Sequence, residues 1–187
     1  MNELSLHILD ICQNSTKANA TLISILIEER TEENTFTIDI IDNGDGMDKE
    51  TLERVTDPFF TTRTTRKVGL GISLFKMAAE QSNGFLNIQS EKTKGTTLKC
   101  MFELNNIDRA PLGKIEETIA ILLLNAEGAD IVYKHVVNDL IYIFDSREVK
   151  EVLEDVPLTD LNVIVWIKDN IKEGILNIHK EETLWNL

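Results

Sequence analysis

The sequence lacks the features that mark secreted, membrane-spanning and disulfide-rich proteins. It contains only two cysteines, Cys12 and Cys100, which stand in apolar contexts without metal-ligand spacing, so the cysteines indicate neither a disulfide nor a zinc site. The chain does not start with a basic segment followed by an apolar one, and the longest apolar run, residues 119–124, is too short to span a bilayer. These absences predict a cytoplasmic protein without membrane binding.

Positive charge is also scarce. The 187 residues include 19 Lys and Arg against 32 Asp and Glu, which gives a net charge of -13. Such a field repels phosphate backbones and anionic lipids, so general nucleic-acid binding is disfavoured. Because 42% of the residues are hydrophobic, the chain is long and apolar enough to bury one sizeable core that carries a smaller extension.

Periodicity in the first 104 residues predicts an alternation of helices and paired strands. Apolar residues recur at helical spacing in two segments, and apolar and polar residues alternate in four others. Asp48 can cap a short helix. The expected order is helix 3–18, strands 21–28 and 35–42, a short helix to about residue 55, a polar loop to 67, helix 69–81, and strands 85–90 and 96–104.

After residue 105 the pattern remains structured but carries no motif. We expect helices over 116–126, 146–154 and 159–171, and strands over 131–136 and 140–144. No internal repeat or low-complexity tract is present. The predicted domain organisation is therefore a domain over residues 1–104 and an α+β extension of unknown role over residues 105–187.

The opening helix carries a polar stripe opposite its apolar face. The stripe consists of Glu3, His7, Asp10, Asn14 and Lys17, which follow one another at steps of three and four. A solvated helix face explains the pattern equally well. However, Leu6 and Leu9 fill much of the remaining circumference, and a narrow stripe with an acid, an amide and a cation suits Mg-phosphate.

The segment of residues 41–47, Ile-Asp-Asn-Gly-Asp-Gly-Met, follows a predicted strand. Asp42 shares its parity with Phe36, Ile38 and Ile40, so its carboxylate should point toward the core, where it needs hydrogen-bond donors. An adenine amino group would supply one, and Gly44 and Gly46 would let the backbone approach a flat base. A plain Asn-Gly turn stays possible, whereas a calcium loop lacks an acid at a required position.

Residues 61–73 combine a basic loop with the start of a helix. Three cations within five residues reverse the local charge, and a glycine pair then opens the helix, where free N–H groups favour an anion. The candidate phosphate contacts are Thr62, Arg63, Arg66, Lys67, Gly69, Leu70 and Gly71. A solvated loop and close packing of the glycines are the alternatives.

Thr96 shares parity with Leu98, so its hydroxyl could reach the same ligand as Asp42.

In this order, the segments resemble the GHKL superfamily of gyrase, heat-shock chaperone, histidine-kinase and mismatch-repair ATPases over residues 1–104. The resemblance implies a Bergerat fold: a two-layer α/β sandwich with a mixed, mainly antiparallel sheet and helices on one face, which binds ATP and Mg²⁺. By this resemblance, Asn14 is the magnesium ligand and Lys17 a phosphate contact. The adenine box consists of Asp42, Gly44, Gly46 and Met47, and Thr96 is the adenine-side threonine. Residues 57–67 form the lid, and Gly69 and Gly71 belong to the second glycine box.

Two positions depart from that pattern. Hydrolytic members place a Glu four residues before the magnesium-binding Asn. This chain has Asp10 at that position, which is shorter by one methylene but can serve as the base. A contact from Asp10 to Mg²⁺ through water also stays open. The leading glycine of the second box is replaced by Lys67. Histidine kinases carry a phospho-accepting His on a helical hairpin before this domain, and only 13 residues precede Asn14, so we do not expect a complete sensor kinase.

The resemblance leaves two functions open. One is a small stand-alone ATPase or ATP-dependent protein kinase, of which bacterial anti-sigma-factor kinases are the nearest small analogues. The other is a binding module without catalysis, in which ATP or ADP orders the lid and thereby controls a partner surface. In the first, the γ-phosphate passes to water or to a Ser, Thr or His of a partner. A protein partner is expected, and homodimerisation stays open; a plain α/β domain with a coincidental pattern is the remaining alternative.

Overall fold

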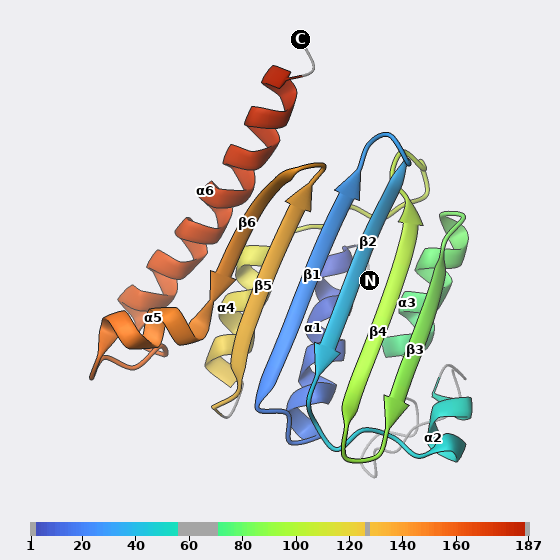
Figure 1. Cartoon of the computed structure of the whole chain (residues 1–187), viewed down its shortest axis with the longest axis horizontal. Helices are drawn as coiled ribbons and strands as arrows, with labels where there is room; N and C mark the ends of the chain where they lie inside the picture. The colour runs from blue at the N-terminus through green and yellow to red at the C-terminus, as the bar shows by residue number, and fades with distance from the viewer. Residues whose placement is uncertain (1–2, 56–70, 126–127, 186–187) are drawn as a thin grey trace.

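Six strands form a single sheet in the order β3-β4-β2-β1-β5-β6 (Figure 1). The structure is a computed structural model, and it describes residues 3–55, 71–125 and 128–185. The strands are β1 (Leu22–Arg30), β2 (Thr35–Asp42), β3 (Phe85–Glu91), β4 (Gly95–Glu103), β5 (Asp130–Val137) and β6 (Leu140–Asp145). All pairings are antiparallel except that of β1 with β5, which is parallel. The predicted mixed, mainly antiparallel sheet is therefore confirmed.

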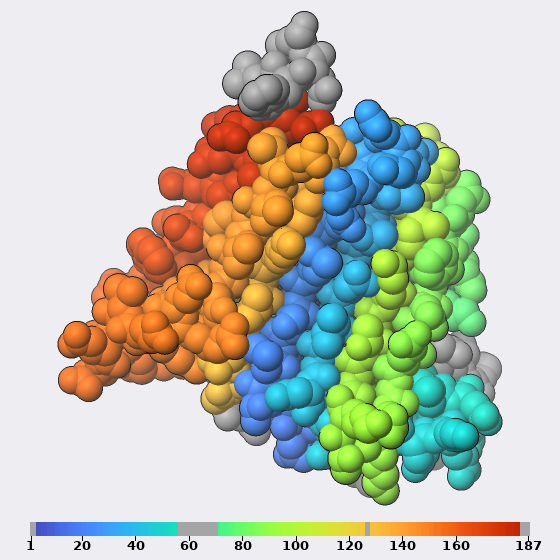
Figure 2. Space-filling model, viewed as in Figure 1, coloured from blue at the N-terminus to red at the C-terminus, as the bar shows by residue number. Residues whose placement is uncertain are grey.

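The longer helices lie on one face of this sheet, and the short ones lie at its edges (Figure 1). The longer helices are α1 (Leu4–Lys17), α3 (Gly71–Gln81), α4 (Ile115–Asn125) and α6 (Leu161–Trp185), and the short ones are α2 (Lys49–Arg54) and α5 (Ser146–Leu153). Among them, α1 contacts α3 and α4, and α6 contacts α4, β5 and β6. Figure 2 shows the opposite face, on which the strands are uncovered. This arrangement confirms the predicted two-layer α/β sandwich.

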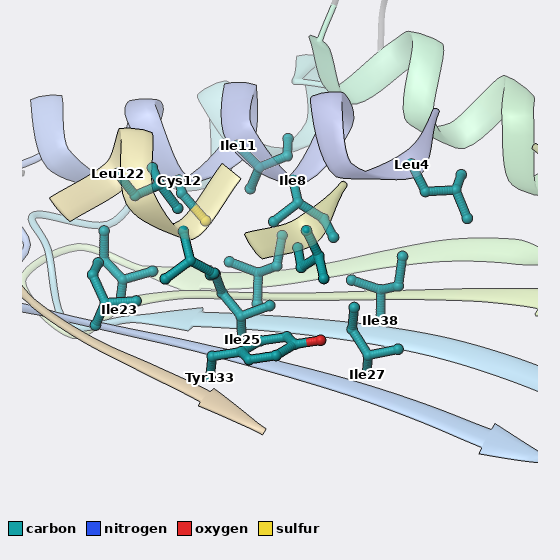
Figure 3. Close-up of a cluster of buried hydrophobic side chains, with 14 of the residues drawn as sticks. Leu4, Ile8, Ile11, Cys12, Ile23, Ile25, Ile27, Ile38, Leu122 and Tyr133 are labelled. Atoms are coloured by element: carbon teal, nitrogen blue, oxygen red, sulfur yellow. The ribbon is translucent and has the colours of Figure 1, made fainter. Parts of the chain in front are cut away.

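The core lies between the sheet and the helices. Figure 3 shows Leu4, Ile8, Ile11 and Cys12 of α1 directed toward alternate side chains of β1 and β2. Each of these residues is buried, as the helical spacing of apolar positions predicted. Alternation along the strands sends every second side chain to the same face. The helical spacing in α1 and the alternation along the strands therefore both direct apolar side chains into one layer.

The segment after residue 105 contributes to the same sheet and the same core. β5 lies beside β1, with Ile23 opposite Ile131 and Ile25 opposite Tyr133. Leu122 of α4 and Tyr133 pack in the same cluster as the side chains of α1 and β1 (Figure 3). Because β1 lies between β2 and β5, the extension completes the layer that the first 104 residues begin.

The last helix is longer than its sequence predicted. The expected end was residue 171, but α6 continues to Trp185. Gly174 stands inside the helix, where a Cβ would lie 2.1 Å from the ring of Tyr142. Glycine therefore lets α6 pack closely against Tyr142 of β6, although glycine is a weak helix former. None of the helices within the described ranges is long and apolar enough to cross a membrane.

A nucleotide-sized cavity at one end of the sheet

A cavity of about 560 Å³ opens between α1, the start of α3 and the ends of β2, β3 and β4. This volume lies within the range of roughly 300–1,000 Å³ that is typical of small-molecule sites. Its wall combines apolar side chains with a few polar ones. The lining residues among those described are Asp10, Ile11, Asn14, Ser15, Lys17, Ala18, Ile40, Asp42, Gly46, Met47, Asp48, Thr51, Val55, Gly71, Ile72, Ile88, Lys92, Thr96 and Leu98.

Asp42 lies at the inner wall of this cavity with its carboxylate buried, as its parity on β2 predicted. One carboxylate oxygen, Oδ1, accepts hydrogen bonds from the backbone N–H groups of Gly44 at 3.0 Å and Thr96 at 3.2 Å. The other oxygen, Oδ2, accepts one from the Ser15 hydroxyl at 2.6 Å. A carboxylate offers about four acceptor positions. Asp42 is thus held in place by the protein and keeps capacity for a donor on a bound molecule.

The polar stripe of α1 contributes three of its members to the cavity. Asp10, Asn14 and Lys17 all line it, because residues at steps of three and four share one face of a helix. Asn14 and Asp10 are half-buried, and Lys17 is exposed. An acid, an amide oxygen and a cation therefore meet beside the apolar wall.

His7 does not belong to that solvent-facing stripe, and this prediction was wrong. Its side chain is only 2% exposed and stacks on Phe75 of α3, with ring centroids 5.0 Å apart and an interplanar angle of 10°. Burial, together with the positive N-terminus, lowers the pKa of His7 to about 4. Leu6, which was expected to help bury the helix, is instead 42% exposed. The buried face of α1 is rotated toward α3, which the periodicity of α1 alone could not indicate.

The two glycines of the adenine-box segment are also approached closely by the protein's own backbone. A Cβ on Gly44 would lie 2.5 Å from the carbonyl oxygen of Ala18, and one on Gly46 would lie 2.1 Å from that of Glu91. Gly46 also has a φ of +64°. Glycine is therefore required here by close approach of neighbouring backbone. Gly46 and Met47 line the cavity, whereas Gly44 contacts it through its hydrogen bond to Asp42.

Gly71 brings the start of α3 against Asp10. A Cβ at Gly71 would lie 1.7 Å from the Asp10 carboxylate, so any larger residue would displace that carboxylate from its present position. The remaining predicted phosphate contacts, Thr62, Arg63, Arg66, Lys67, Gly69 and Leu70, and the predicted lid over residues 57–67, lie outside the described residues.

Sequence reasoning missed three polar groups around the cavity. Ser15 donates to Asp42, and its position on the apolar side of α1 hid this role. Ser90 of β3 contacts the Thr96 hydroxyl at 2.9 Å and accepts a hydrogen bond from the N–H of Met47. Lys92, in the turn between β3 and β4, lines the cavity. For Lys92 no sequence signal was available, because only the fold brings that turn beside α1.

Comparison with known proteins is consistent with this architecture. The sequence profile of the histidine kinase-, DNA gyrase B- and HSP90-like ATPases matches residues 2–106. The chain belongs to this ATPase family. The match identifies residues 2–106 as a histidine-kinase-like ATP-binding domain, and the chain has the Bergerat fold.

Relatives of this family member include a putative sensor protein of Shewanella frigidimarina, which is 37% identical over 103 residues, 54% of this chain and 16% of that protein. A sensor kinase CckA of Brucella abortus is 35% identical over 86 residues, 43% of this chain and 9% of the relative. The chain thus corresponds to a small part of the length of each of these relatives. A solved N-terminal domain of a DNA repair protein shares the fold, with a TM-score of 0.53, 16% identity and coverage of 78% of this chain and 52% of that one.

Proposed function

We propose that this ATPase-family protein binds Mg-ATP in the cavity beside α1 and transfers the γ-phosphate to water or to a protein hydroxyl or imidazole. The observation that carries the proposal is the buried Asp42 carboxylate, which the protein holds by three hydrogen bonds at the wall of a cavity lined by Ile40, Ile88 and Leu98. A charged acceptor beside apolar side chains suits a flat base with an amino donor.

The adenine ring is assigned to this inner part of the cavity. Its amino group would donate to Asp42, and its faces would contact the apolar side chains of β2, β3 and β4. Thr96 stands opposite Asp42 in the strand register, so its hydroxyl lies on the same side of the base. Ser15 and Ser90 orient Asp42 and Thr96 through their hydrogen bonds.

The phosphates are assigned to the end of the cavity that Asn14, Lys17 and Gly71 line. The amide oxygen of Asn14 is suited to hold Mg²⁺, which when bound would offset phosphate charge. Lys17 and Lys92 add positive charge at the cavity wall. The basic residues Arg63, Arg66 and Lys67, together with Thr62, Gly69 and Leu70, are proposed as further phosphate contacts on sequence grounds.

Asp10 is proposed as the general base. It lies one turn before Asn14 on α1 and lines the cavity at the start of α3. Its carboxylate would accept the proton of the attacking water or hydroxyl as the bond to phosphorus forms and the bond to the β-phosphate breaks. A protein is the expected acceptor or partner, because a net charge of -13 disfavours polynucleotides.

The decisive experiment combines phosphate release with ADP affinity. Asp10→Asn keeps the side chain's shape, so we expect turnover to fall by about 100-fold or more, in the range of a lost general base, with ADP affinity unchanged. Asp169→Asn, an exposed acid on α6, is the matched control and should behave like the wild type.

Two other outcomes have distinct meanings. If the wild type binds ADP but neither releases phosphate nor labels candidate partner proteins, the protein is a nucleotide-gated binding module and not an enzyme. If correctly folded wild type does not bind ADP or a non-hydrolysable ATP analogue with Mg²⁺, the proposed nucleotide site is wrong.

A further inference from the structure

A second group of polar side chains lies at the other end of the sheet. Glu29 of β1, His135 of β5 and His179 of α6 come together, and their potential ligand atoms all lie within 4.8 Å of one another. The Nε2 atom of His135 is 2.8 Å from Oε1 of Glu29, and the Nε2 atom of His179 is 3.4 Å from the same oxygen. Through His179, the helix α6 contacts Glu29 and His135, although α6 begins 24 residues after the end of β5.

The register of the sheet explains why these groups meet. Glu29 shares the parity of Ile23, Ile25 and Ile27, whose side chains point to the helix-covered face. On the parallel neighbour β5, His135 is opposite Ile27 and points to that same face. Because α6 contacts β5 and β6 there, His179 can reach both side chains.

The spacing of the three atoms fits a transition-metal ion. Zinc binds imidazole nitrogen and carboxylate oxygen at about 2.0–2.2 Å in tetrahedral geometry, which places the ligand atoms about 3.4 Å apart. The two imidazole nitrogens lie 2.8 Å and 3.4 Å from the Glu29 oxygen, and all three atoms lie within 4.8 Å of one another, so modest side-chain movement would reach that spacing. Two nitrogen donors also disfavour Mg²⁺ and Ca²⁺, which prefer oxygen ligands.

The surroundings of His135 match those of a metal-bound histidine. Its side chain is fully buried, and its second ring nitrogen, Nδ1, lies 2.7 Å from the hydroxyl of Tyr133. Such a partner fixes the orientation of the ring and leaves Nε2 directed at the site. Glu29 contributes a carboxylate oxygen that contacts both imidazole rings, so the three groups present one oxygen and two nitrogens to the same point.

We propose that Glu29, His135 and His179 bind one zinc ion, with water in the fourth position, and that this ion fastens the C-terminal part of α6 to β1 and β5. His179 is 42% exposed on its side chain, which gives water and the ion access. The site lies six residues along β1 from Ile23, the partner of Asp42, which corresponds to about 20 Å. It is therefore separate from the nucleotide cavity and independent of the proposed function.

The test uses the full chain without a polyhistidine tag and without nucleotide. After treatment with a chelator, the protein is titrated with Zn²⁺ in competition with a chromogenic chelator, and with Co²⁺ while its visible spectrum is recorded. We expect one equivalent of zinc and the intense visible absorption of tetrahedral cobalt. Zinc should also raise the midpoint of thermal unfolding.

Variants assign the ion to these residues. His179→Ala and Glu29→Gln should each lose at least tenfold in zinc affinity and lose the cobalt spectrum. Tyr133→Phe should lose about 10- to 100-fold, as is typical when the hydrogen-bond partner of a metal-binding histidine is removed. His179 is only half-buried, so its replacement leaves the core intact. His7→Gln, which changes the remaining histidine of the chain, and Lys180→Ala, next to His179, are matched controls that should bind zinc like the wild type.

Two results overturn the proposal. If the wild type takes up no stoichiometric zinc, the cluster is a hydrogen-bonded contact between α6 and the sheet and nothing more. If His179→Ala binds zinc as tightly as the wild type does, the ion is bound elsewhere. Neither result affects the nucleotide site, which is measured separately by ADP titration of the same preparation.

Discussion

Replacing Asp42 by Asn tests the nucleotide site at its most constrained residue. The asparagine oxygen can still accept the two backbone N–H groups that now contact Oδ1, and the Ser15 hydroxyl can rotate to accept from the new amide. We therefore expect a folded protein that is destabilised by only about 1–2 kcal/mol, the cost of weakened hydrogen bonds.

The effect on binding should be larger. The substituted amide presents a donor where the adenine amino group also donates, and the charge-assisted bond, worth about 1.5–3 kcal/mol, is lost. At about 1.4 kcal/mol per decade, ADP affinity should fall by roughly 10- to 150-fold. Calorimetric titration with ADP in the presence of Mg²⁺ measures this change, after circular dichroism and thermal unfolding have confirmed that the variant is folded.

Asp39→Asn is the matched control for this measurement. Asp39 lies on the same strand, but it lines a groove on the opposite face of the sheet, where Lys99 is 3.8 Å away. It should bind ADP like the wild type. The reasoning is refuted if folded Asp42→Asn binds ADP as tightly as the wild type, or if Asp39→Asn weakens binding equally.

Three further predictions concern stability. Gly46→Ala should destabilise the protein by more than about 2 kcal/mol in urea unfolding, because φ is +64° and the added Cβ would lie 2.1 Å from a backbone oxygen; an unchanged midpoint would contradict the structure. Ile171→Ala, which truncates a fully buried side chain of α6, should cost about 2–5 kcal/mol and retain one cooperative transition, whereas two transitions would show that the extension unfolds separately. Since the folded protein lowers the pKa of His7 from 6.5 to about 4, the unfolded chain binds the extra proton in that window, and stability should fall as the pH falls from about 6.5 to 4. At about 1.4 kcal/mol per pKa unit the loss should be roughly 3 kcal/mol, and His7→Phe should flatten this part of the stability curve.

The sequence by itself determined the local elements and much of the nucleotide cavity. Alternation along residues 35–42 placed Asp42 on the buried side of its strand, because successive side chains of a strand point to opposite faces. Steps of three and four placed Asp10, Asn14 and Lys17 on one side of α1, where all three line the cavity. Asp48 caps α2 through a 2.9 Å hydrogen bond from the N–H of Thr51, as its residue type predicted. These features follow from the geometry of single elements.

Only the tertiary structure decided which elements pack against one another. His7 is buried because Phe75 of α3 covers it, and Gly44 and Gly46 are required because distant backbone approaches them. The parallel pairing of β1 with β5 joins the extension to the core, and it places Glu29 next to His135 although 106 residues separate them. Local periodicity carries no information about such partners, since contacts between distant segments are fixed by the burial of whole faces and not by the spacing within one element.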